Sequence, residues 1–178
     1  SLFSLEEDLP VALFFGGSKG AHSINQAVQR HLEPLLAVTQ IIHISGIADW
    51  PELSNIYKQL PTHTQSRYRV YPYLHEEMSA AFSAADLAIS RAGASALGEY
   101  PLFKLPAILV PYPFAWRYQK VNADYLVNQG AAVTLSDEML ESELLPTVLN
   151  LLAHPEKRER MASAMAKLAR PNAAEQIG

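Results

Sequence analysis

The sequence contains no cysteine, which excludes a disulfide framework and any metal site built on thiolates. It has no apolar run that approaches the roughly 20 residues needed to span a bilayer. Its N-terminus lacks the basic and apolar regions of a signal peptide. There is also no block of like charges, and the formal net charge of -4 disfavours a general nucleic-acid-binding surface. We therefore expect a cytoplasmic protein without a nucleic-acid partner.

An initiator methionine is also missing, and an apolar strand begins almost at once, at residue 11. Of the 178 residues, 49% are hydrophobic, which is enough to build the core of one globular domain. We therefore expect residues 1–178 to form a single domain taken from a longer protein.

Short apolar runs alternate with segments of helical periodicity along the whole chain. Strands are predicted at 11–15, 40–45, 67–74, 86–90, 107–111 and 131–135. Helices are predicted at 20–37, 51–60, 76–85, 94–104 and 116–129, with two more that are separated near Pro155. Because the strands are apolar on both faces and each is followed by a helix, they indicate a parallel sheet covered on both sides. The predicted fold class is α/β, a Rossmann-like doubly wound parallel sheet of about six strands.

In the strand order common for this fold, 3-2-1-4-5-6, the first and fourth strands are neighbours. Ligands of such sheets bind at this point, beyond the carboxyl ends of the strands. The two glycine-rich turns "GGSKGA" and "SRAGAS" follow the first and fourth predicted strands, respectively. We therefore expect both turns to face one crevice.

The turn "GGSKGA" has the features of a phosphate-binding turn. Gly16 and Gly17 permit a sharp turn, and the free N–H groups of the next helix bind phosphate, with Ser18 as a further donor. A plain strand-to-helix turn in which Ser18 is the N-cap explains the same residues equally well. The turn matches neither a P-loop nor the G-x-G-x-x-G fingerprint, which disfavours a dehydrogenase that uses NAD.

The turn "SRAGAS" repeats these features and adds an acid. Gly93 permits close approach to the backbone, and Ala94 and Ser95 place small side chains at the start of a helix. Glu99 lies one turn after Ser95 on the same helical face, where a carboxylate can accept hydrogen bonds from a ribose diol. The alternative is a solvated surface glutamate.

Other polar residues are candidates for the same crevice. Arg117, Gln119 and Asn122 lie near the start of a predicted helix, where they can reach sugar hydroxyls. Tyr118, Val121, Tyr125 and Leu126 form the apolar side of that helix. His75 follows the third strand and is a candidate for a base pocket, whereas His43 lies inside an apolar strand and is expected to be a core residue. No set of His, Asp or Glu has the spacing of metal ligands.

The segments "GGSKGAHSINQAV", "SRAGASALGEYPLFKLPAILVPYPFAWRYQKVNADYL" and "QGAAVTL" together resemble the C-terminal domain of MurG-type glycosyltransferases of family 28. The resemblance covers roughly residues 10–170 and implies one half of a GT-B enzyme. In that family GlcNAc is transferred from UDP-GlcNAc to undecaprenyl-diphospho-muramoyl-pentapeptide in peptidoglycan synthesis. The resemblance implies an inverting transfer that needs no metal or other cofactor.

The resemblance also implies a role for each matching residue. The diphosphate would lie against Gly17, Ser18, Gly93, Ala94 and Ser95. Uracil would pair with the backbone of Leu74, Glu99 would hold the ribose, and Arg117 and Gln119 would contact the sugar. The general base and the lipid-linked acceptor belong to an N-terminal domain absent from this chain. The chain alone is therefore expected to hold no catalytic residue and to be inactive, and the full protein to lie on the cytoplasmic face of the inner membrane.

The sequence departs from the family pattern at Tyr118, which stands where a glutamine that reads the sugar is expected. A related GT-B enzyme with another UDP-sugar or lipid acceptor, such as a lipid galactosyltransferase or a UDP-sugar epimerase, is therefore an alternative. A non-catalytic module that binds nucleotide sugars is another, because fold does not determine function.

Overall fold

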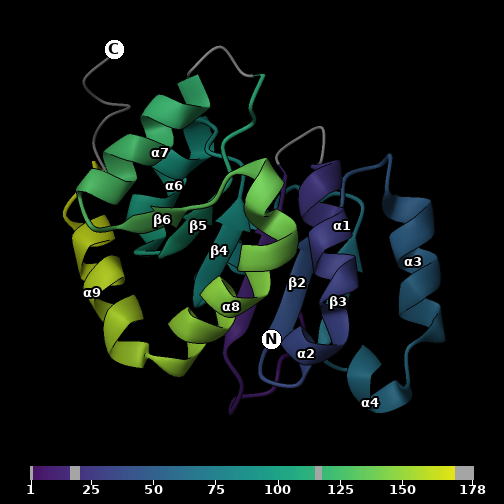
Figure 1. Ribbon diagram of the computed structural model, residues 1–178. Helices are drawn as coiled ribbons and strands as arrows, with labels where there is room; N and C mark the ends of the chain where they lie inside the picture. The colour runs from purple at the N-terminus through teal and green to yellow at the C-terminus, as the bar shows by residue number, and fades with distance from the viewer. Residues whose placement is uncertain (1, 17–20, 115–117, 171–178) are drawn as a thin grey trace.

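The computed structural model describes residues 2–16, 21–114 and 118–170. Its strands form one parallel sheet in the order β3-β2-β1-β4-β5-β6 (Figure 1). They are β1 (Val11–Phe15), β2 (Gln40–Ile44), β3 (Tyr68–Tyr71), β4 (Leu87–Ser90), β5 (Ala107–Leu109) and β6 (Ala132–Thr134). The predicted fold class and strand order are confirmed, and β1 and β4 are neighbours.

The helices in the described residues are α1 (His22–Arg30), α2 (Leu32–Leu36), α3 (Trp50–Gln59), α4 (Thr62–Gln65), α5 (Met78–Ala84), α6 (Ala94–Phe103), α7 (Tyr118–Asn128), α8 (Leu140–Ala153) and α9 (Pro155–Ala166), with a 3₁₀ turn η1 (Asp137–Met139). In these residues no helix combines the length and apolar character needed to cross a membrane. The prediction of one helix over 20–37 is wrong, because two helices meet at His31. Pro34 has no N–H to bond the carbonyl of Arg30, and its ring clashes with that carbonyl in a continuous helix.

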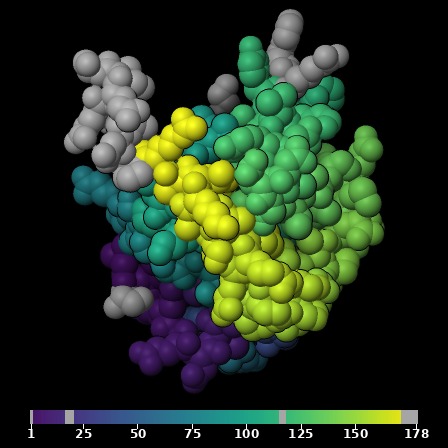
Figure 2. Space-filling view, turned by 90° about the vertical axis from the view of Figure 1, so that its left-hand side faces the viewer, coloured from purple at the N-terminus to yellow at the C-terminus, as the bar shows by residue number. Residues whose placement is uncertain are grey.

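Each face of the sheet has its own core, because successive side chains of a strand point to opposite faces. Phe14 packs with side chains of α1, α2, α3 and α8. Its neighbours Leu13 and Phe15 pack with side chains of α5, α6 and α7 on the other face. Helix α9 contributes Met161 to the first core and Met165 to the second, and Figure 2 shows it beside α7 on the surface. Both faces are therefore buried, as the apolar strands predicted.

Helix α7 turns a different side to the core from the one predicted. Its buried residues are Ala123 and Leu126. Tyr118, Val121 and Tyr125 are 75%, 62% and 45% exposed. The predicted apolar side is thus wrong except for Leu126, since the small Ala123 lets the helix approach the sheet closely.

Helix α6 continues through Pro101 and ends at Phe103, where Lys104 adopts a left-handed conformation with φ of 54°. The N–H of Leu105 donates to the carbonyl of Tyr100 at 3.0 Å and closes the helix end. Because Pro101 lies in the last turn, the proline removes one hydrogen bond from the helix without breaking it.

Gly98 lies on the exposed side of α6, and a Cβ added there meets no atom within 4 Å. Gly98→Ala should therefore raise the free energy of unfolding by about 0.5–1 kcal/mol, because alanine loses less backbone entropy in a helix. Urea denaturation measures the change. Gly130→Ala is the matched control: the space is equally open, but φ is +72°, so this substitution should destabilise the protein. Equal effects of the two substitutions would contradict the explanation.

Candidate functional site

A cavity of about 560 Å³ lies beyond the carboxyl ends of β1 and β2 and beside the start of α6. We call it the crevice cavity. Its lining residues come from four segments that are far apart in the sequence: Phe15, Ile44, Tyr73, Leu74, His75, Glu76, Met78, Ser95 and Glu99. Its position is the one at which open parallel sheets bind ligands.

Four of the candidate residues predicted from the sequence line this cavity together. Leu74 and His75 follow β3 on one side, and Ser95 and Glu99 lie one helical turn apart on α6 on the other. Gly93 is the N-cap residue of α6, and Ala94 is its first residue. Gly17, Ser18 and Arg117 lie outside the described residues.

The start of α6 offers free backbone N–H groups next to the cavity. No side chain caps this helix within the described residues, and the N–H of Ala96 is bonded to the carbonyl of Gly93 at 3.1 Å. Gly93 has φ of -73°, a conformation open to any residue, and an added Cβ meets no atom within 4 Å. The glycine is therefore not required by the local backbone, and its absent side chain leaves room in front of the helix.

Gln119 and Asn122 are both predicted to contact sugar hydroxyls, and in this structure both form hydrogen bonds with the protein backbone. The Oε1 atom of Gln119 accepts a hydrogen bond from the N–H of Tyr112 at 2.8 Å. The Nδ2 atom of Asn122 donates to the carbonyl oxygen of Ala92 at 3.0 Å. Asn122 thus ties α7 to the turn between β4 and α6, a structural role that the sequence interpretation missed.

Arg91 is a residue of this region for which the sequence analysis predicted no role. Its side chain is only 10% exposed, and Nη1 lies 2.5 Å from Oδ1 of Asp137. Nη2 donates to Oγ of Ser23 at 2.8 Å, and Nη1 also donates to the carbonyl of Val110 at 3.2 Å. The guanidinium carbon lies 5.1 Å from the ring centre of Tyr112. The only signal in the sequence is an arginine directly after a buried strand.

A buried chain of hydrogen bonds fixes the start of α1 to β2 and β3. The Nδ2 atom of Asn25 donates to the carbonyl of Ser45 and to Asp49, each at 2.7 Å. The Oδ1 atom of Asn25 lies 2.8 Å from Nε2 of His43, and Nδ1 of His43 lies 2.8 Å from the hydroxyl of Tyr68. Since Oδ1 can only accept, Nε2 carries the proton and Nδ1 accepts from Tyr68.

Desolvation by burial lowers the pKa of His43 to about 3, and the negative charge of Asp49 opposes this shift only in part. Burial raises the pKa of Tyr68, which therefore stays protonated and can donate. The prediction that His43 is a core residue with satisfied hydrogen bonds is confirmed.

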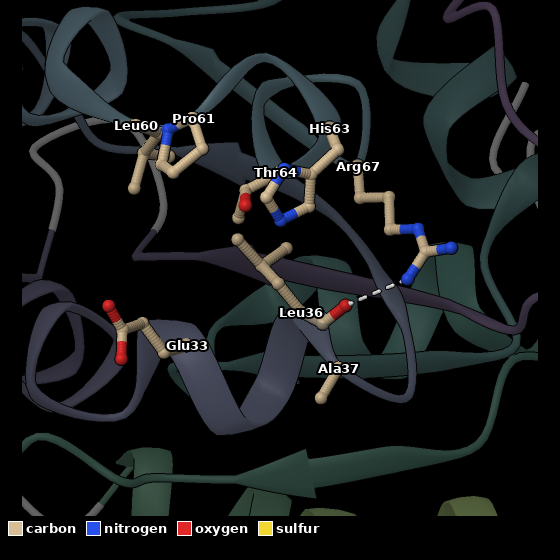
Figure 3. Close-up of a pocket in the computed structure, with 8 residues that line it drawn as sticks. All are labelled: Glu33, Leu36, Ala37, Leu60, Pro61, His63, Thr64 and Arg67. Atoms are coloured by element: carbon tan, nitrogen blue, oxygen red, sulfur yellow. Dashed lines mark hydrogen bonds between the residues drawn. The ribbon is translucent and has the colours of Figure 1, made fainter.

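A second hollow lies at the opposite edge of the sheet, near the amino ends of β2 and β3 (Figure 3). It is lined by Glu33, Leu36, Ala37, Leu60, Pro61, His63, Thr64 and Arg67. Nη1 of Arg67 donates to the carbonyl of Leu36 at 3.4 Å, the dashed line in Figure 3. None of the predicted site residues lies there. In the part of the chain that the structure describes, no group of three His, Asp or Glu side chains is placed to hold a metal ion.

Comparison with known proteins identifies relatives across almost the entire chain. The family profile of the glycosyltransferase family 28 C-terminal domain matches residues 11–177. One relative, from Roseiflexus sp. (strain RS-1), is 42% identical over 197 residues, which cover 99% of this chain and 44% of the relative. It is named UDP-N-acetylglucosamine--N-acetylmuramyl-(pentapeptide) pyrophosphoryl-undecaprenol N-acetylglucosamine transferase. The protein of the same name from Chlorobium limicola is 37% identical and covers 98% of this chain and 47% of the relative. The chain thus spans less than half the length of these two relatives.

Solved structures agree with this assignment. MurG of Acinetobacter baumannii matches with a TM-score of 0.81 and 28% identity, over 98% of this chain and 50% of the solved one. UDP-GlcNAc 2-epimerase from Neisseria meningitidis matches with a TM-score of 0.65 and 14% identity, over 98% of this chain and 44% of the solved one. At that identity the second match shows a shared fold alone.

Proposed function

Because the chain belongs to the glycosyltransferase family 28 C-terminal domains, we propose that residues 1–178 form the domain that binds the sugar donor in a MurG-like transferase. The full enzyme would transfer GlcNAc from UDP-GlcNAc to a lipid-linked muramoyl-pentapeptide acceptor. The observation that carries the proposal is the crevice cavity, in which Leu74, Ser95 and Glu99 meet at the switch point of the sheet.

The geometry of the cavity supports an assignment of the donor's parts. The diphosphate would lie at the free N–H groups of Ala94 and Ser95, in the space left by Gly93, with Gly17 and Ser18 on the other side. The uracil would lie against Leu74 and the ribose against Glu99, which line the same cavity. The sugar would then extend toward Arg117 and Gln119.

In the proposed mechanism an acceptor hydroxyl attacks C1 of the sugar from the side opposite to UDP, so the configuration at C1 inverts. The bond from C1 to the diphosphate oxygen breaks, and negative charge grows on the departing UDP. The N–H groups at the start of α6 and the dipole of that helix would stabilise this charge without a required metal or other cofactor.

The general base and the acceptor site would belong to the N-terminal domain of the full protein, which would lie at the cytoplasmic face of the membrane. The present chain would therefore bind the donor and transfer nothing.

Isothermal titration of the chain with UDP, UDP-GlcNAc, UDP-galactose and NAD tests the proposal. We expect binding of UDP and UDP-GlcNAc and none of NAD. Preference for UDP-galactose would favour a related enzyme with another donor, to which the exposed Tyr118 at the start of α7 points. Preference for NAD, or no nucleotide binding at all, would contradict the proposal.

Glu99→Ala should weaken UDP binding by about 1–2 kcal/mol, because it removes the hydrogen bonds between a partly exposed carboxylate and the ribose diol. Glu76→Ala is the matched control, since Glu76 lines the same cavity but is assigned no contact with the ribose. Titration of both variants with UDP measures the effect. Equal UDP affinities of the Glu99→Ala and Glu76→Ala variants would show that Glu99 is a surface residue without a contact to the ribose.

A further inference from the structure

We propose that Arg91, together with Asp137, is a positioning residue of the donor site: it sets the first turn of α1 relative to the start of α6, where the diphosphate is proposed to bind. This inference rests on the proposed function and goes beyond the residues assigned above. Arg91 does not line the crevice cavity, and neither does Asp137.

The guanidinium of Arg91 connects four chain segments at the carboxyl edge of the sheet. It belongs to the loop between β4 and α6, and its Nη2 bonds Ser23 in the first turn of α1. Its Nη1 bonds the carbonyl of Val110 after β5 and the carboxylate of Asp137 after β6. Ser23 in turn donates to Oδ1 of Asp137 at 3.1 Å. Removal of this one side chain therefore releases contacts among all four segments.

The charge of Arg91 is already paired inside the protein. Both terminal nitrogens contact Asp137, at 2.5 and 3.3 Å, and this carboxylate is only 25% exposed. The Tyr112 ring lies against the guanidinium as well. A nearly buried arginine with these partners holds neighbouring segments in place and does not attract the ligand by its charge. Bidentate pairing fixes the plane of the guanidinium, and the carboxylate neutralises its charge.

The nucleoside half of the site depends on other contacts. Tyr100 is fully buried in α6, and its hydroxyl bonds Oγ of Ser90 at 2.5 Å. This contact holds α6, and with it Glu99, against β4 independently of Arg91. Loss of Arg91 should therefore shift Ser23 in the first turn of α1 and the segment at Asp137, while Asn25 keeps α1 tied to β2 and the surroundings of Leu74 and Glu99 stay in place. Displacements of about 1 Å are enough to weaken the binding of a group that several donors hold together.

Titration of the same variants with UDP and with uridine tests whether Arg91 affects only the diphosphate part of the site. NMR titration with uridine measures binding at the nucleoside part alone, whereas UDP binding also includes the diphosphate. We expect Arg91→Lys and Asp137→Asn each to weaken UDP binding about tenfold and to change uridine binding by less than twofold. Ser23→Ala removes two hydrogen bonds but leaves the ion pair of Arg91 and Asp137, so it should weaken UDP binding two- to fivefold. This variant keeps the proposal testable if Arg91→Lys does not fold. Arg67→Lys, in the hollow at the opposite edge, is the control and should change neither.

The alternatives give different results. If Arg91 acted as a free charge on the phosphates, Asp137→Asn would strengthen UDP binding, and this result would overturn the positioning role. Equal losses for UDP and uridine would assign Arg91 to general stability and would overturn it too, as would unchanged affinities in all three variants. Failure of the unaltered chain to bind UDP would instead overturn the proposed function and this inference with it.

Discussion

Replacing Asn25 with leucine should lower the free energy of unfolding by about 3–5 kcal/mol. Leucine has a similar shape but cannot replace the hydrogen bonds of the amide to Ser45, Asp49 and His43. The carbonyl of Ser45 and the Nε2–H of His43 belong to residues that are at most 1% exposed, so water cannot take the place of Asn25. Each buried group left without a partner destabilises the fold by about 1–3 kcal/mol.

Urea denaturation at neutral pH measures this effect, with Gln26→Leu as the control. Gln26 is exposed on the same helix, so its replacement should change stability by less than about 0.5 kcal/mol. A loss below 1 kcal/mol for Asn25→Leu would show that the buried chain of hydrogen bonds reorganises around the leucine.

The contribution of His43 to the free energy of unfolding should fall by roughly 3 kcal/mol as the pH falls from 7 to 4. Burial lowers the pKa of His43 to about 3 in the folded state, against 6.5 in the unfolded chain. Between these two values the unfolded chain binds a proton that the folded chain does not, so acid favours unfolding in this window. Above pH 6.5 the imidazole is neutral in both states and the contribution is complete.

The measurement is the pH dependence of the free energy of unfolding in the unaltered chain and in His43→Gln. Glutamine is polar but does not titrate, so the variant should be less stable at pH 7 and should lose less stability on acidification. The difference between the two slopes isolates His43 from the carboxylates, which titrate in both proteins. Parallel curves would show that His43 takes up its proton in the folded state at an ordinary pH.

The strands and their order were predictable from the sequence because burial on both faces leaves a strong signal. "VALFF" is apolar throughout, "QIIHI" is buried throughout and mostly apolar, and each is followed by a helix. The helix boundaries and the buried side of each helix were harder to predict, because they depend on single residues and on packing. Pro34 separates α1 from α2, and the small Ala123 turns α7 so that Tyr118 and Tyr125 face solvent.

One part of the site geometry was predictable because it depends on where the strands end. Leu74, Ser95 and Glu99 line one cavity because the carboxyl ends of parallel strands lie at one edge of the sheet, and their contacts with a donor stay a prediction. The contacts of Asn122 and Arg91 could not be predicted, because their partners, Ala92 and Asp137, are set by how the loops fold back onto one another. Such contacts leave no periodicity in a sequence.

The order of the strands also bears on how the chain is made. Of the strands described, β1 is synthesised first, yet one of its edges pairs with β4, which is complete only at Ser90. Until then this apolar strand has an open edge, and the backbone N–H of Val11 lacks its partner, the carboxylate of Asp86. An open apolar edge is a template for pairing with other chains. The emerging chain therefore carries an aggregation-prone segment from the synthesis of Phe15 until that of Ser90.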